Sequence, residues 1–254
     1  MKKLVFVFLC LFAFNGFASA QKILPFKPTL SIVIKGGISV PVSGGTYTSL
    51  RTPVTYEGGS FKDYFGAFPG AQLDASVNLT PSFGIFGNFS ADFLSPKEAR
   101  VGLTGATYTQ SNSTQFSGSI GPRIYVNLPG NIFSKFYTEA GFGIYSLKYG
   151  DEKITYATSG GVSDNFSYSA ASQLGFNIGA GFNVSASPKS FVNISIKYHN
   201  ILKKSDVTFS EKWTHTAGGQ DDLIILNTAY DLASRSYIQI SAGFGFNLGF
   251  WFFK

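Results

Sequence analysis

The stretch 238–252 alternates without interruption between two kinds of side chain. Apolar residues take every second position: Ile238, Ile240, Ala242, Phe244, Phe246, Leu248, Phe250 and Phe252. The positions between them are mostly small or polar: Gln239, Ser241, Gly243, Gly245, Asn247, Gly249 and Trp251. A period of two indicates a β-strand with one apolar and one polar face. Large apolar residues opposite small polar ones are typical of a barrel wall in lipid, which is apolar outside and polar inside.

The same alternation occurs in seven earlier segments. They are 30–40, 70–79, 83–94, 115–128, 136–148, 173–184 and 191–200. Together with 238–252 they predict an all-β chain that forms an eight-stranded antiparallel transmembrane β-barrel. Pro122 removes a hydrogen-bond donor from its strand, so we expect a β-bulge beside Gly121.

The connections between these segments alternate in length. Residues 80–82, 129–134 and 185–190 form short turns, whereas 41–69, 95–114, 149–172 and 201–236 are long. Short periplasmic turns and four long extracellular loops are typical of outer-membrane barrels. An even number of strands puts both ends of the barrel on the short-turn side. Residues 207–213 and 223–226 predict an additional hairpin, which we expect as a rim extension above the membrane. Within the wall, it would instead give the ten strands that a channel needs.

Residues 1–20 have the three parts of a secretory signal peptide. Lys2 and Lys3 form the charged region, 4–14 the apolar region, and Ala18-Ser19-Ala20 the cleavage site. We expect cleavage after Ala20, export to the bacterial outer membrane and a single barrel domain over 21–254. Cys10 would leave with the signal peptide, so the mature chain would have neither a disulfide nor a thiol nucleophile.

The composition fits a chain that meets a membrane as strands. Only 13% of the residues are charged and 44% are hydrophobic, whereas about 25% of an average soluble domain is charged. The formal net charge of +6 is scattered along the chain without a basic run. We therefore expect no nucleic-acid partner.

Glycine alternates with apolar residues in three of the predicted strands, and Gly121-Pro122-Arg123 occurs in a fourth. The three runs are Ala140-Gly141-Phe142-Gly143, Gly179-Ala180-Gly181-Phe182-Asn183 and Ala242-Gly243-Phe244-Gly245-Phe246. This pattern resembles the small outer-membrane β-barrel family, which includes the OmpA transmembrane domain and OmpX. The resemblance covers nearly the whole mature chain, and it implies outer-membrane lipid and the barrel-assembly machinery as partners. Family members tend to end in an aromatic residue that this machinery reads, whereas Lys254 follows the aromatic end here.

Six charged residues point inward by parity, three of each sign: Lys35, Asp74, Asp92, Arg123, Glu139 and Lys197. Arg123 and Glu139 flank the turn at 129–134 almost symmetrically, so they should be cross-strand neighbours. Eight strands enclose a space that is only wide enough for side chains to fill. We therefore expect a polar plug of paired charges. The alternative, a selectivity filter in a narrow passive solute channel, needs a wider lumen.

The two histidines, His199 and His215, belong to no group of residues at metal-ligand spacing, so we expect neither a metal nor a cofactor. His199 followed by Ser205 is loosely similar to the catalytic His and Ser of lipid A deacylases, which are also small barrels. A lipid-modifying outer-membrane enzyme is therefore a second alternative. The spacing is too long for neighbours on one strand and no acidic partner is evident, so we assign no catalytic residue.

Aromatic residues near the strand ends should form girdles at the two membrane interfaces. The candidates are Tyr198, Tyr237, Phe250, Trp251 and Phe252. The long connections carry further aromatic residues, among them Tyr156, Tyr168 and Trp213. These form either a binding surface or a hydrophobic cluster that caps the barrel mouth, and we favour the cap.

The sequence favours a monomeric barrel with a structural or surface-interaction role rather than a catalytic one. Long loops on a rigid scaffold commonly carry function, so binding is expected at the long connections. The ligand would be a surface glycan, lipopolysaccharide or another protein.

Overall fold

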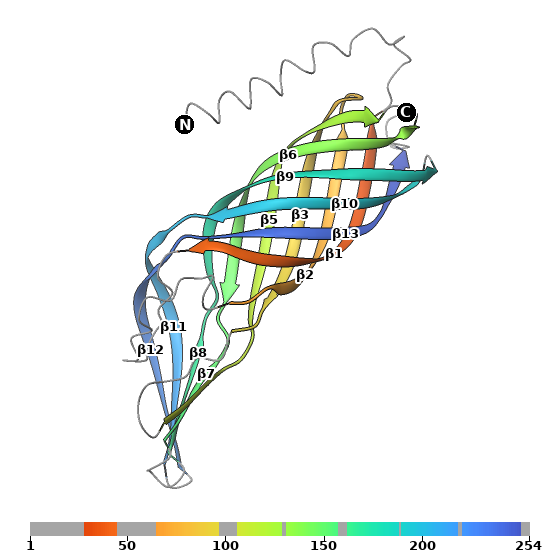
Figure 1. The fold of residues 1–254 in the computed structure, drawn as a ribbon. Helices are drawn as coiled ribbons and strands as arrows, with labels where there is room; N and C mark the ends of the chain where they lie inside the picture. The colour runs from red at the N-terminus through yellow and green to blue at the C-terminus, as the bar shows by residue number, and fades with distance from the viewer. Residues whose placement is uncertain are drawn as a thin grey trace.

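The structure is a computed structural model that describes residues 28–44, 65–96, 106–128, 131–156, 162–187, 189–217 and 220–249. The expected signal peptide (1–20) and the strand end expected at 250–252 lie outside these residues. None of the described residues belongs to a helix long and apolar enough to cross a membrane. The described chain consists of a closed barrel and a sheet that continues beyond one of its ends (Figure 1).

Eight strands form the closed barrel. They are β1 (Thr29–Gly44), β2 (Phe68–Asn78), β3 (Phe83–Leu94), β5 (Ser113–Leu128), β6 (Asn131–Lys148), β9 (Ala171–Ser187), β10 (Ser190–Ile201) and β13 (Arg235–Gly249). Each strand is antiparallel to both neighbours in the order β1-β13-β10-β9-β6-β5-β3-β2, and β2 pairs with β1 to complete the ring. The predicted eight-stranded antiparallel barrel is thus confirmed. Each predicted segment coincides with one of these strands, with differences only at the ends.

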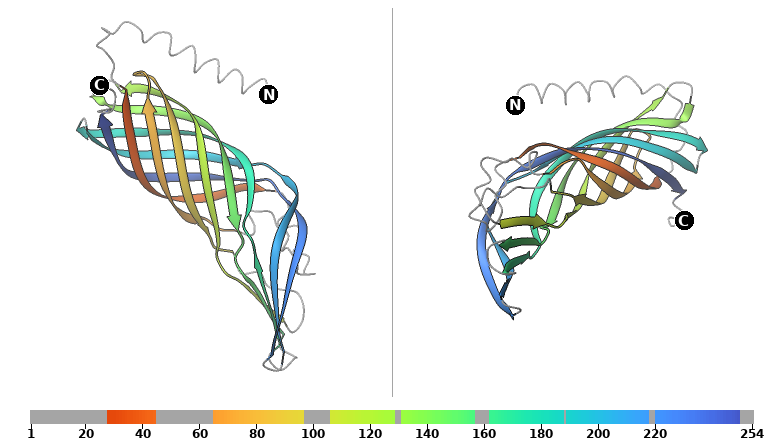
Figure 2. Two further views of the ribbon diagram at one scale, coloured as in Figure 1. Left: turned by 180° about the vertical axis from the view of Figure 1, so that it is seen from behind. Right: turned by 60° about the horizontal axis from the view of Figure 1, so that its bottom comes forward.

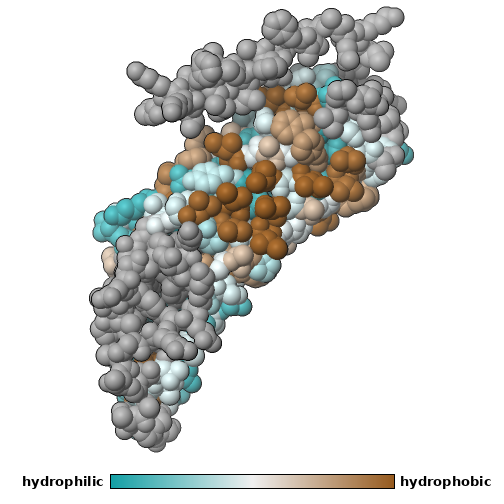
Figure 3. Space-filling view, in the orientation of Figure 1, coloured by the Kyte–Doolittle hydropathy of each residue, from teal (hydrophilic) through white to brown (hydrophobic). Residues whose placement is uncertain are grey.

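Side chains alternate between the outside and the inside of this wall. The outward residues are large, apolar and exposed, and Ile34, Phe142 and Leu174 expose 68%, 79% and 65% of their surface. The inward residues are mostly polar and buried, as are Ser39 and Asn177. In the space-filling view, hydrophobic patches lie on the visible face of the barrel part (Figure 3). A soluble protein rarely exposes an apolar band of this kind, whereas lipid solvates it.

The bulge expected beside Gly121 and Pro122 is not present. The register between β5 and β6 is the same before and after these two residues, although they themselves are missing from the ladder. On the other side of the strand, Pro122 keeps its place opposite Ile85 of β3. The bulge prediction was wrong because the wall accommodates proline by omitting two pairs from one ladder rather than by inserting a residue.

The other five strands form a second antiparallel sheet, which we call the extension. They are β4 (Ala106–Gln110), β7 (Glu152–Tyr156), β8 (Ser163–Tyr168), β11 (Lys204–Ala217) and β12 (Gln220–Leu232), in the order β12-β11-β8-β7-β4. The extension continues from the barrel end at which β1 finishes and β13 begins (Figures 1 and 2). The long connections meet at this end, so it is the extracellular one. The additional hairpin expected at 207–213 and 223–226 exists as β11 and β12, outside the barrel wall.

An apolar cluster, which we call the cap, joins the barrel mouth to the extension. The barrel contributes Phe68, Leu94, Tyr145, Leu147, Ile201 and Tyr237, and the extension contributes Ile154, Phe166, Tyr168, Val207, Phe209 and Leu232. Tyr156 and Trp213 pack against this cluster. The loop aromatic residues Tyr156, Tyr168 and Trp213 therefore belong to a hydrophobic cap, which is the interpretation that the sequence favoured.

Gly121 lies so close to β6 that any side chain would collide with it. A Cβ atom added at Gly121 would stand 1.9 Å from the carbonyl oxygen of Ala140. Gly121→Ala should therefore force the two strands apart and cost about 1–3 kcal/mol of folding free energy. The matched control is Gly118→Ala on the same strand, because a Cβ there meets nothing within 4 Å. Urea unfolding in lipid vesicles compares the two, and equal midpoints would contradict the close packing.

Candidate functional site

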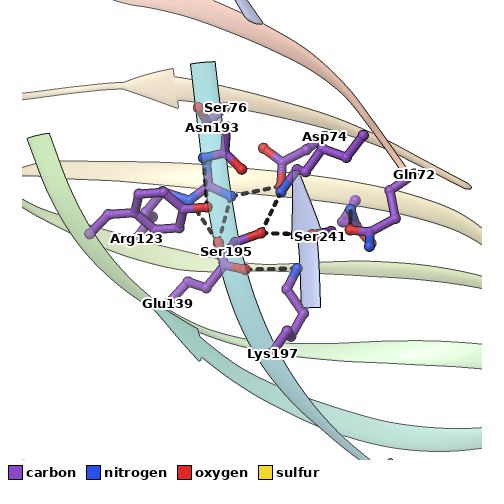
Figure 4. A network of polar contacts seen from close by, with 12 residues as sticks. Gln72, Asp74, Ser76, Arg123, Glu139, Asn193, Ser195, Lys197 and Ser241 are labelled. Atoms are coloured by element: carbon purple, nitrogen blue, oxygen red, sulfur yellow. Dashed lines mark hydrogen bonds and ion pairs between the residues drawn. The ribbon is translucent and has the colours of Figure 1, made fainter. Parts of the chain in front are cut away.

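Five of the six charged residues expected in the lumen meet in one group, the lumen charge cluster. Arg123 lies between two carboxylates: Nε donates to Glu139 Oε2 over 2.7 Å, and Nη2 donates to Asp74 Oδ2 over 2.7 Å. Lys197 Nζ lies 2.7 Å from Glu139 Oε1, and Lys35 Nζ lies 3.5 Å from Asp74 Oδ2. None of the five exposes more than 3% of its side chain. Figure 4 shows how these side chains converge from separate strands of the barrel.

The register between β5 and β6 and two aromatic rings hold Arg123 in place. The pairing of β5 with β6 puts Arg123 opposite Glu139, the neighbours expected from the turn between them. The guanidinium lies over the rings of Phe86 and Tyr137, with its carbon 5.0 and 4.4 Å from their centroids. These are favourable cation–π distances. The lumen is therefore filled at this level by buried, mutually paired charges, as eight strands require.

The sixth expected charge, Asp92, lies in a separate polar layer closer to the extracellular end. Its carboxylate accepts hydrogen bonds from Gln239 Nε2 at 3.1 Å and from the Tyr237 hydroxyl at 3.4 Å. Ser39 and Ser90 also donate to it. Asp92 therefore does not join the lumen charge cluster, because it points into the lumen at a different height.

Arg235 is a buried lumen cation that the sequence analysis missed. Its Nη2 donates to Gln115 Oε1 over 2.8 Å, and its Nη1 donates to Gln173 Oε1. We had assigned Arg235 to the long connection 201–236. Extending the alternation of the last strand backwards by three residues would have placed it on the inward face.

The expected aromatic girdle is corrected at one position. Tyr237 was expected at a membrane interface, but it is fully buried in the lumen, where its ring stacks on His199 at 4.5 Å. The prediction was wrong because Tyr237 has the inward parity of Gln239. Tyr198 does lie on the outward, partly exposed face of β10. The other three candidates, Phe250, Trp251 and Phe252, lie outside the described residues.

His199 does not meet Ser205. The imidazole is buried, with Nδ1 3.0 Å from the Tyr145 hydroxyl and Nε2 3.2 Å from Gln239 Oε1. Ser205 is exposed on β11 in the extension. Across the described part of the chain, no group of three or more His, Cys, Asp or Glu could hold a metal ion.

A second polar centre lies in the extension around Asp164. Its carboxylate accepts hydrogen bonds from Trp213 Nε1 at 3.0 Å and the Tyr156 hydroxyl at 2.9 Å, and it lies 2.7 Å from His215 Nδ1. The partial burial of Asp164 alone would raise its pKa. The hydrogen bonds from His215, Trp213 and Tyr156 outweigh that cost, so the pKa of Asp164 is lowered. This centre ties β7, β8 and β11 together.

The outermost strand of the extension is apolar and exposed. Within the described residues, β12 pairs only with β11, so its other edge presents backbone groups without a strand partner. Leu223, Ile224 and Ile225 on this strand expose 54%, 39% and 67% of their surface. Natural proteins usually avoid a long apolar edge strand unless something binds to it.

Comparisons with known proteins return only distant structures. No protein-family model and no curated protein matches the sequence. Among solved structures, a major outer membrane protein from Thermus thermophilus is similar, with a TM-score of 0.49, 10% identity and coverage of 87% of this chain and 99% of that one. Neisserial surface protein A has a TM-score of 0.47 and 9% identity, covering 86% and 97% of the two chains. OprG from Pseudomonas aeruginosa has a TM-score of 0.45 and 14% identity, covering 90% and 100%.

The chain's own geometry therefore defines its class. A closed antiparallel ring of eight strands, an apolar outer surface and a polar lumen together form an outer-membrane type of β-barrel. The extension with its exposed edge strand goes beyond that plan.

The lumen charge cluster contains three cations and two carboxylates. Glu139→Gln removes the carboxylate that Arg123 and Lys197 share, and we expect a loss of about 3–5 kcal/mol because Lys197 then lacks its ion-pair partner and Arg123 keeps only Asp74. The double variant Arg123→Met, Glu139→Gln removes a cation as well and should lose less. Urea unfolding in lipid vesicles measures both. A double variant at least as unstable as the single one would show that charge pairing does not hold the cluster.

The Asp164 centre should make the extension acid-sensitive. The pKa of Asp164 is lower in the folded protein than its usual value of 3.8. Its contribution to stability is therefore present above about pH 4 and is lost as the pH falls through the folded pKa. Amide hydrogen exchange in β8 and β11 should accelerate over this range. Asp164→Asn should exchange faster at neutral pH and lose the acid step, and an unchanged acid step in this variant would refute the assignment.

Proposed function

We propose that this protein is a surface-recognition protein of the bacterial outer membrane, which binds a partner protein through the β12 edge of its extension. It would reach the membrane by means of the signal peptide at residues 1–20, with cleavage after Ala20. The barrel serves as the anchor and the extension as the recognition element. The observation that carries the proposal is the exposed apolar edge strand held outside the membrane.

The filled lumen supports an anchor rather than a channel. Solute passage needs a continuous water-filled path, and the side chains of Arg123, Asp74 and Glu139 are almost completely buried across the barrel. The polar layer around Arg235 lies above them and is also buried. A pore through both layers would have to break several desolvated ion pairs and hydrogen bonds.

The chemistry of the edge favours a protein partner over a glycan. Glycans are usually held by exposed aromatic faces and hydrogen-bonding groups, but Phe166, Tyr168 and Phe209 are buried in the cap. The exposed run 223–225 on β12 is aliphatic, and next to it is a row of backbone donors and acceptors. This combination suits an added β-strand from another chain, in which main-chain hydrogen bonds supply affinity.

Two negative charges on β12 further define the sequence that the partner segment should have. Asp221 and Asp222 are exposed at the start of β12, beside the aliphatic run that begins at Leu223. Cross-strand pairs of opposite charge stabilise a sheet, whereas like charges destabilise it. The partner segment is therefore extended and aliphatic, with basic residues opposite the two aspartates.

Synthetic strands test this proposal directly. The purified protein in neutral-lipid nanodiscs is titrated with a fluorescent peptide of alternating Val and Lys, and anisotropy gives the affinity. The double variant Leu223→Thr, Ile225→Thr should weaken binding about tenfold or more, because it removes apolar contact but keeps strand propensity. Thr208→Ser on β11 is the control and should bind as the parent does.

Two further peptides distinguish the alternatives. A Val and Asp peptide should not bind, and a Val and Lys peptide with central prolines should not bind either, because proline cannot donate to the ladder. Equal binding of the proline peptide would overturn strand addition. A steady ionic current from the parent protein in planar bilayers would instead support the channel.

A further inference from the structure

Two lysines lie directly above an apolar row that crosses three neighbouring strands of the barrel's outer wall. In the pairing of β6 with β9, Ile144 lies opposite Leu174 and Ser146 lies opposite Ser172. Leu202, which follows β10, donates its backbone N–H to the carbonyl of Leu174 over 2.8 Å. Ile144, Leu174 and Leu202 therefore form one continuous row across β6, β9 and the end of β10.

The next level of the wall is polar. Lys204 Nζ donates to the carbonyl oxygen of Ser172 over 3.0 Å, which fixes the ammonium beside the middle strand. Lys148 is the last residue of β6 and has the same outward parity as Ile144 and Ser146. The two lysines thus flank the cross-strand pair of Ser146 and Ser172, which carries two hydroxyl groups. We call these four residues the lysine–serine patch.

Exposure shows that the lysine–serine patch faces outward. Ile144, Leu174 and Leu202 expose 57%, 65% and 47% of their surface, which is the exposure of the lipid-facing band. Lys148 and Lys204 are exposed too. In Figure 3, hydrophilic surface adjoins the hydrophobic band near the end of β10. This level is therefore the boundary where hydrocarbon gives way to lipid headgroups.

The patch occupies only one sector of the barrel. At the extracellular ends of β1, β2 and β3, the outward residues are Val42, Pro69 and Phe93, which are apolar. Ion pairs do not neutralise the two lysines: across the described residues, the nearby pair at 2.9 Å joins Lys203 to Asp231 and involves neither lysine of the patch. Among the residues that the structure describes on these strands, positive charge and hydroxyl donors thus lie together above one stretch of apolar wall.

We propose that the lysine–serine patch binds the phosphate of an anionic lipid in the outer leaflet. The ammonium groups of Lys148 and Lys204 pair with the phosphate, and the serine hydroxyls donate hydrogen bonds to its oxygens. The acyl chains lie along Ile144, Leu174 and Leu202. A lipid-borne phosphate fits better than a free one, because the apolar row directly below supplies contacts that only a lipid can use. The proposal is independent of the β12 edge.

The test uses nanodiscs of phosphatidylcholine that contain a minor fraction of phosphatidylglycerol or, in a second set, of lipid A. Native mass spectrometry counts the anionic lipid that remains with the barrel. The parent protein should be enriched in anionic lipid, and Lys148→Gln, Lys204→Gln should bind it roughly 25-fold less tightly, about fivefold for each lysine. If the barrel retains only lipid A, lipid A is the source of the phosphate. If it retains phosphatidylglycerol as well, either lipid can supply the phosphate.

The control variant is Lys153→Gln, Lys212→Gln, which removes two exposed lysines from the extension. It loses the same charge and should retain anionic lipid as the parent does. An unheated gel shift verifies that each variant is folded. Equal loss in both variants, or no loss in the patch variant, would overturn the proposal. Displacement of the lipid by millimolar inorganic phosphate would overturn the lipid preference.

Discussion

The need to pair every backbone hydrogen-bonding group inside lipid governs this structure. Water is absent from the hydrocarbon region, so an open strand edge there would leave donors and acceptors unsatisfied. The pairing of β1 with β13 and with β2 meets this requirement by closing the ring. Closure at eight strands then limits the lumen to a space that side chains must fill. Polar side chains must therefore fill the interior, and in this barrel they include a set of buried charges that neutralise one another.

These buried charges also separate the role of the barrel from that of the surfaces outside its lumen. Arg123 bridges Asp74 and Glu139 across the lumen, so the wall strands are joined through their side chains as well as through their ladders. In the proposed function, a barrel fastened in this way serves as a rigid support rather than as a route for a solute. Under that proposal, interaction takes place on the outer wall or beyond the mouth, where side chains and backbone edges are still accessible.

Parity along the chain was enough to predict the barrel, because a period of two assigns every residue in a lipid-facing wall to one side. Parity also predicted that Arg123 and Glu139 are neighbours, and it identified the residues that point into the lumen. Parity failed where strands continued beyond the expected ends. The last strand was predicted to begin at residue 238, so Arg235 was assigned to a loop and Tyr237 to the aromatic girdle. The extension was harder to predict, since β4, β7 and β8 are short. In addition, β7 and β8 pack through tertiary contacts in the cap that local alternation does not encode.

The cap supports the proposal that the extension is a recognition element. A long hairpin alone is marginally stable in water, and it would be a poor platform for binding. Here Val207 and Phe209 at the base of β11 are buried against barrel residues such as Tyr145 and Ile201, so the hairpin begins from a hydrophobic core. Further out, the bonds from Trp213 and His215 to Asp164 fix β11 to β8. β12 contributes Leu232 to the cap and pairs along its length with β11, so the structure holds its apolar edge outside the membrane while leaving that edge exposed.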